Sequence, residues 1–197
     1  MTETGAQRRL AAILVADVVG YSRLMGEDEH GTLSAVKALS SDLISPKITA
    51  HSGRLVKTTG DGILVEFASV VSAVKCAVEV QEALGTPTWA TQPKKIQLRI
   101  GVNLGDVIAE ESDVFGDGVN IAARLESLCD PASVLVSASA YDQVKGKLPF
   151  SFEDIGPQNL KNIAEPIRAY KVEANFADRV APQPTDRPSI AVLPFRI

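Results

Sequence analysis

Apolar and polar residues follow patterns along the first third of the chain that predict a strand, a helix and a hairpin. The residues from Leu10 to Val15 are continuously apolar, which is typical of a strand buried on both faces. Leucines and a valine recur at helical spacing between Thr32 and Ser45, and Pro46 is expected to kink or end that helix. Two further predicted strands, Arg54–Thr59 and Ile63–Phe67, flank a Gly-Asp-Gly sequence that favours a tight turn.

The following hundred residues continue this alternation of helix-like and strand-like segments. Ser69 is the predicted cap of a helix whose apolar stripe reaches Leu84, and residues 86–93 are predicted to form a loop. From Ile96 to Leu104 apolar and polar residues alternate strictly, which predicts a half-buried strand. The other predicted elements are a short strand at 107–110, a helix from its cap Asp117 to Leu128, strands at 133–136 and 169–172, and a short helix at 138–144.

The order of these elements predicts both the fold class and the domain boundaries. The order β-α-β-β-α-β is that of a ferredoxin-like sheet covered by helices, which is an α+β fold. We expect one domain over residues 1–175, because residues 176–189 (FADRVAPQPTDRPS) have the proline-rich, charged composition of a linker. Residues 190–197 are again apolar and strand-like, so we expect an additional C-terminal domain to begin there.

Composition excludes several functional classes. The 197-residue chain has 20 Lys and Arg against 24 Asp and Glu, and this net charge of −4 argues against a general nucleic-acid binder. No apolar run is long enough to span a membrane, and the N-terminus lacks the apolar segment of a signal peptide. The two cysteines are too few for a disulfide framework. We therefore expect a cytoplasmic location.

Two aspartates stand where a β-α-β-β unit would bring them together. Asp17 ends the first apolar strand and Asp61 lies in the predicted hairpin turn. Taken singly, Asp17 can be explained as a helix cap and Asp61 as an ordinary turn residue. In the predicted topology, however, the end of the first strand lies beside the hairpin between the second and third. Two carboxylates meeting there suit Mg²⁺ together with substrate phosphates.

The turn that follows Asp17 adds groups that can hold phosphate. The residues Val18, Val19, Gly20, Tyr21 and Ser22 lead into the next helix. Peptide N–H groups and a hydroxyl at a helix start are suitable donors to phosphate oxygens. Together, the aspartates and this turn predict a site for a metal-bound phosphate compound.

Three sequence motifs resemble one known family. The sequences ADVVGYS, LVKTTGDGILVEF and DVFGDGVNIAARLES, in this order, resemble the class III nucleotidyl cyclase catalytic domains, of adenylyl type. The resemblance covers about Arg9 to Val172 and implies that family's palm-like fold. It also implies that Asp17, Val18 and Asp61 bind two Mg²⁺ or Mn²⁺ ions in each active site.

The resemblance assigns the remaining site positions to parts of a nucleotide. Lys57 and Asp113 match the residues that select the base, and Asn120 and Arg124 match the catalytic pair that orients the ribose and stabilises the transition state. Lys161 matches a lysine that contacts the terminal phosphates. Adenine has an acceptor at N1 and a donor at its 6-amino group, whereas guanine has the reverse pattern. A lysine with an aspartate therefore favours ATP over GTP.

The implied activity is an adenylate cyclase, a lyase that converts ATP to cyclic AMP and pyrophosphate for signal transduction. The family forms its active sites between two catalytic domains, and this chain carries both sets of residues, so a homodimer is expected. The alternative is a weak or inactive cyclase-like module that binds nucleotide or dimerises to regulate an attached domain. A diguanylate cyclase is disfavoured because its GG[DE]EF hairpin is absent, and a P-loop NTPase because the chain has no GxxxxGK[ST] motif.

Overall fold

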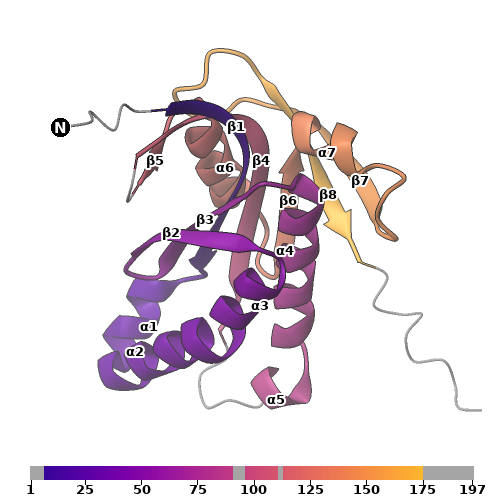
Figure 1. Cartoon of the computed structure of the whole chain (residues 1–197). Coiled ribbons are helices and arrows are strands. Elements are labelled where there is room, and N and C mark those ends of the chain that lie inside the picture. The colour runs from indigo at the N-terminus through magenta and orange to yellow at the C-terminus, as the bar shows by residue number, and fades with distance from the viewer. Residues whose placement is uncertain (1–6, 91–95, 111–112, 175–197) are drawn as a thin grey trace, which may run out of the picture.

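The structure is a computed structural model that describes residues 7–90, 96–110 and 113–174. The linker predicted at 176–189 and the segment 190–197 lie outside the described residues. Within them, a single mixed sheet runs through the molecule with helices packed on both faces (Figure 1).

The sheet has the strand order β2-β3-β1-β4-β6-β8-β7, with β5 paired to the edge of β4. Its first four strands confirm the predicted ferredoxin-like core, because β1 lies between β3 and β4, antiparallel to both. The described strands are β1 (Gln7–Val18), β2 (Gly53–Thr59), β3 (Gly62–Phe67), β4 (Leu98–Ala109), β5 (Val114–Phe115), β6 (Ser133–Ser137), β7 (Ser151–Gln158) and β8 (Ile167–Glu173).

Helices on the two faces of the sheet differ in number. Helix α6 packs on one face, while α4, α7 and the first helical segments pack on the other (Figure 1). The described helices are α1 (Tyr21–Glu27), α2 (Glu29–Ala38), η1 (Leu39–Ile44, a π-helical segment), α3 (Ser45–Ala50), α4 (Val70–Leu84), α5 (Pro87–Ala90), α6 (Asp117–Leu128) and α7 (Ala138–Val144).

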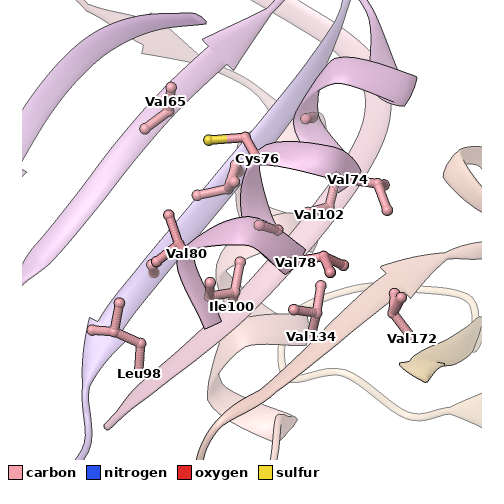
Figure 2. Close-up of a cluster of buried hydrophobic side chains, with 14 of the residues drawn as sticks. Val65, Val74, Cys76, Val78, Val80, Leu98, Ile100, Val102, Val134 and Val172 are labelled. Carbon is pink, nitrogen blue, oxygen red and sulfur yellow. The ribbon is translucent and has the colours of Figure 1, made fainter. Parts of the chain in front are cut away.

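The larger part of the core lies between α4 and the sheet. Figure 2 shows valines of α4, among them Val74 and Val78, above Ile100 and Val102 of β4. The predicted cap is confirmed, since the Ser69 hydroxyl accepts a hydrogen bond from the Ser72 amide at the start of α4. Burial of this apolar stripe holds α4 against the centre of the sheet.

On the opposite face, α6 approaches β4 at backbone distance. Gly101 of β4 has no side chain, and a Cβ atom there would overlap the Ala122 carbonyl oxygen and the Glu126 amide nitrogen of α6. Gly105, further along β4, similarly faces the backbone of Gly118. The two glycines therefore set how closely α6 lies on the sheet.

The first helical region differs from its prediction. Helix α2 begins at Glu29 rather than Thr32. Pro46 was expected to kink or end the helix; it does not end the helical run, which continues to Ala50, but the run changes from η1 to α3 one residue before it. Pro46 is accommodated because α3 starts at Ser45, so that proline occupies the first helical turn, where its missing N–H is not needed.

Three further expectations need correction. The segment 86–93 was expected to be a loop, but it contains α5, and its residues 91–93 lie outside the described residues. Asp117 is the first residue of α6 and not its cap, which is Gly116. The strands expected near Ile96–Leu104 and 107–110 are one continuous strand, β4. Its middle is buried on both faces because α6 covers the side that carries Gly101.

We expect Gly101→Ala to destabilise the fold. The added methyl must push α6 away from β4, and such overpacking costs about 2–3 kcal/mol of unfolding free energy, measured by urea denaturation. Gly26→Ala in α1 is the control, because a Cβ atom there meets nothing within 4 Å and alanine favours a helix. Equal stability of the two variants would contradict the close contact.

Candidate active site

Asp17 and Asp61 meet at one end of the central strand. Ala16 of β1 pairs with Ile63 of β3, so Asp17 lies level with the start of β3 and the turn before it. That turn is a tight one, since Thr59 pairs with Gly62 and Gly60 adopts a left-handed conformation with φ of 67°. The two carboxyl groups are close enough to influence each other's protonation, as the predicted topology required.

The shared position of these two carboxyl groups changes their chemistry. Burial, the hydrogen bond to Asp17 and the negative charge of Asp17 raise the pKa of Asp61 to about 6, while Arg99 opposes the rise. A carboxyl pair that holds a proton in this way is suited to exchange it for a divalent cation.

The donor set for a cation is small within one chain. The described residues contain no group of three or more His, Cys, Asp or Glu side chains that could hold a metal ion. The Val18 side chain is buried, so this residue can contribute only its main-chain carbonyl oxygen. Two carboxylates and one carbonyl fit Mg²⁺, which commonly keeps few protein ligands and completes its shell with water and substrate phosphates.

Sequence reasoning missed Arg99, which lies beside Asp17. Register pairs Arg99 of β4 with Asp17 of β1, and their side chains form a hydrogen-bonded ion pair with Nη2 to Oδ2 at 2.7 Å. Its Nε also lies 3.1 Å from Oε1 of Glu126, on α6. The signal was present, because a strand antiparallel to β1 can place a cation opposite its terminal aspartate. The alternation alone left Arg99 as one of the polar residues of a half-buried strand.

Lys57 and Asp113 form the second group of the site. The Lys57 Nζ donates a hydrogen bond of 2.7 Å to Asp113 Oδ2, and it lies 5.5 Å from the ring centroid of Phe115. The bond from Lys57, followed by one from the Val114 amide, holds the pKa of Asp113 below its usual value. The contact joins residues 56 positions apart, so the fold creates this pair.

The third group belongs to α6 and the loop before β8. Asn120 and Arg124 lie one helical turn apart on α6, where Asn120 is exposed. The Arg124 Nε donates to the Lys161 carbonyl oxygen at 3.2 Å, and the Lys161 side chain is exposed. The structure therefore brings Lys161 next to Arg124, although only its main chain makes the contact.

The turn after Asp17 has the form expected of it. Gly20 has a φ of 67° and precedes α1, so that Tyr21 and Ser22 are the first residues of that helix. Val19 lies between Asp17 and Gly20 and donates its amide to the Gln97 carbonyl oxygen at 2.9 Å. The turn thus begins at the aspartate pair.

The three groups are separate within one chain. Across the described residues, no hydrogen bond or ion pair links Lys57 or Asp113 to Asp17, and none links Arg124 to Asp61. One chain therefore carries a carboxylate group and a second set of polar groups that are not linked to it by these bonds.

Comparison with known sequences decides the family. The profile of the adenylate and guanylate cyclase catalytic domain matches residues 6–174. The chain belongs to this family. A relative named "Putative adenylate cyclase 3" from Rhizobium meliloti is 44% identical over 99% of this chain and 35% of its own length. An adenylate cyclase of Streptomyces coelicolor is 36% identical over 72% of this chain and 36% of its own length. This cyclase domain thus spans about a third of the curated relatives it matches.

Solved structures agree with the fold. The adenylate/guanylate cyclase/hydrolase from Silicibacter pomeroyi superposes with a TM-score of 0.80 and 43% identity, over 87% of this chain and all of that one. The adenylyl cyclase CyaB from P. aeruginosa gives a TM-score of 0.78 at 21% identity, over 88% of this chain and 98% of that one. The fold predicted for the cyclase domain is therefore confirmed. None of the helices in the described part of the chain could cross a membrane.

We expect Mn²⁺ to raise the melting temperature of the domain through the aspartate pair. The increase should grow between about pH 5 and pH 7.5, because the cation must displace the proton that Asp61 holds with a pKa of about 6. Differential scanning fluorimetry measures it. Asp61→Asn should abolish the increase, whereas Asp142→Asn, in an exposed pair with Lys145, should leave it unchanged. Equal stabilisation of all three proteins would place the cation elsewhere.

Proposed function

We propose that the domain is an adenylate cyclase that converts ATP to 3′,5′-cyclic AMP and pyrophosphate, at sites shared by two copies of the chain. Family membership supports a nucleotide cyclisation. The observation that supports the choice of ATP is the 2.7 Å ion pair between Lys57 and Asp113, since it sets a donor beside an acceptor.

This pair matches the edge of adenine. The Lys57 ammonium donates to N1, and the Asp113 carboxylate accepts from the 6-amino group. Guanine presents an acceptor at position 6 and a donor at position 1. The Lys57 donor would therefore face a donor, and the Asp113 acceptor would face an acceptor. One unpaired buried polar group costs about 1–3 kcal/mol, which corresponds to a preference of about ten- to a hundredfold.

Asp17 and Asp61, with the Val18 carbonyl, are the residues that would hold two divalent ions. Ions bound there supply positive charge that activates the attacking hydroxyl and neutralises the phosphates. At the end of the Val18–Ser22 turn, the amides of Tyr21 and Ser22 are then available to donate to the phosphates, because the first N–H groups of α1 have no partners within the helix. The Val19 amide is already bonded to the Gln97 carbonyl oxygen.

The polar groups on α6 act on the reacting centre. Asn120 orients the ribose so that its 3′-oxygen faces the α-phosphorus, and Lys161 binds the terminal phosphates. As the new O3′–phosphorus bond forms and the bond to pyrophosphate breaks, Arg124 stabilises the charge on the phosphoryl oxygens. The 3′-hydroxyl proton leaves to Asp17 or to water, so the reaction balances without a further reactant.

A homodimer accounts for the separation of the groups. The aspartates of one protomer would face Lys57, Asp113, Asn120 and Arg124 of its partner, which gives two sites around a two-fold axis. Each protomer then contributes half of each site, and a monomer has no complete one.

The Lys57–Asp113 pair predicts a measurable specificity. Lys57→Met should lower the ratio of kcat/KM for ATP to that for GTP by about ten- to a hundredfold, because the donor to N1 is lost. Asp113→Asn should lower the same ratio, because it replaces an acceptor-only carboxylate with an amide that can also donate to the O6 of guanine. Lys145→Met is the matched control, because Lys145 directly follows α7 and forms an exposed ion pair with Asp142. An unchanged ratio in both site variants would refute the assignment of this pair to the base.

Mixing two inactive variants tests the shared sites. Asp17→Ala and Arg124→Ala each remove activity from both sites of their own dimers. In an equal mixture, half of the dimers carry one intact site of their two, so activity should return to about a quarter of that of the unmodified protein. Cyclic nucleotide formation after subunit exchange measures this. No recovery, with exchange confirmed by differently tagged chains, would mean that each site lies within one chain.

A further inference from the structure

Glu126 is a buried acid for which the proposed reaction has no use. It lies on α6, two residues after Arg124, and its side chain is 8% exposed. Burial is the largest influence on its pKa, which is raised above its usual value in spite of the nearby Arg99. Its Oε2 accepts a hydrogen bond of 3.3 Å from the Ser127 hydroxyl, but Oε1 has no hydrogen-bond partner among the described residues. A buried polar atom without a partner calls for an explanation.

The backbone fixes where this carboxyl group lies. Gly101 allows α6 to rest directly on β4, and the Glu126 backbone is one of the two contacts that a Cβ atom at Gly101 would disturb. Arg99 lies two residues before Gly101, on the same face of β4, because strand side chains alternate. Glu126 is therefore held beside the arginine that contacts Asp17.

The contact between the two side chains is incomplete. The Arg99 Nε and the Glu126 Oε1 are 3.1 Å apart and both buried, yet neither atom makes a hydrogen bond with any described residue. The same guanidinium uses its Nη2 for the well-formed 2.7 Å bond to Asp17. The arginine thus lies between two carboxylates and satisfies one of them.

We propose that Glu126 is a positioning residue, which takes over the guanidinium of Arg99 when a divalent cation takes Asp17. The proposal rests on the proposed function, since that assigns the cation to Asp17 and Asp61. In the structure Asp17 is the anion that Arg99 binds. A cation at Asp17 competes for the same oxygens and leaves Arg99 next to added positive charge.

The cost of that exchange depends on Glu126. A partly buried guanidinium that loses its anion is strongly unfavourable unless another anion replaces it. Glu126 is already within reach, and completing the bond from Nε to Oε1 needs only a better angle, since the distance is that of a hydrogen bond. By binding Arg99, Glu126 therefore makes Asp17 available to the cation, although Glu126 itself does not contact the cation.

Mn²⁺ binding to the whole chain, measured by isothermal titration calorimetry, tests the proposal. Glu126→Gln should weaken Mn²⁺ binding by about ten- to a hundredfold, the usual effect of losing a group that supports a metal ligand. Glu79→Gln is the control. Like Glu126, Glu79 is a glutamate that pairs with basic side chains, here Lys47 and His51, but it lies on α4, on the other face of the sheet. Affinity in Glu126→Gln equal to that of the unmodified chain would overturn the proposal.

A second variant separates contact from charge. Glu126→Asp keeps a negative charge on α6, but its shorter side chain moves the carboxylate away from Arg99 Nε. If the contact matters, Glu126→Asp should bind Mn²⁺ as weakly as Glu126→Gln. If it binds as well as the unmodified chain, Glu126 acts by its charge alone and the positioning role is wrong.

The Nε–H signal of Arg99 in ¹H–¹⁵N NMR spectra of the unmodified chain follows the exchange directly. Mg²⁺ should shift this signal downfield as the bond to Glu126 forms, and the shift should be absent in Glu126→Gln. The signal is assigned by comparison with the spectrum of Arg99→Lys, in which it is absent. If Mg²⁺ and Mn²⁺ do not bind the unmodified chain, the proposed function fails. If they bind and the Arg99 signal stays in place, only this inference fails, whether or not the Glu126 variants fold.

Discussion

Strand β1 is hydrogen-bonded to a neighbouring strand on each side. The register of these two pairings decides which charged side chains lie next to Asp17. Pairing with β3 places the Asp61 turn on one side of Asp17, and pairing with β4 places Arg99 on the other. A slip of one residue would turn Asp17 to the opposite face, where α4 packs. The apolar side chains of β1 prevent this slip, because they are buried alternately against α6 and α4.

The second constraint is the close approach of α6 to β4. Gly101 permits this approach, and as a result a single helix carries both an exposed polar residue and a buried acid. Asn120 is exposed on α6, while Glu126 is buried against Arg99. In the proposed mechanism, a movement of α6 would therefore affect both the ribose side of one site and the aspartate side of another.

Much of this arrangement could be predicted from the sequence. The alternation of helix and strand periods predicted the ferredoxin-like core. The β-α-β-β topology predicted that Asp17, at the end of the first apolar strand, and Asp61, in the Gly-Asp-Gly turn, would meet. Strand β7 was missed, because Ser151–Gln158 contains a glycine and a proline and has no regular apolar alternation. Residues whose importance depends on partners distant in sequence were also missed. Arg99 and Glu126 have no local motif, and only strand register and helix packing bring them to Asp17.

The product formed from ATP tests the central claim most directly. The purified chain would be incubated with ATP and Mn²⁺, and the products identified by mass spectrometry, with Asp17→Ala as the control. The account predicts cyclic AMP and pyrophosphate in equal amounts, neither of them in the control. Bound but unchanged ATP in a confirmed dimer would contradict it, and would instead indicate a cyclase-like module that binds nucleotide without cyclising it.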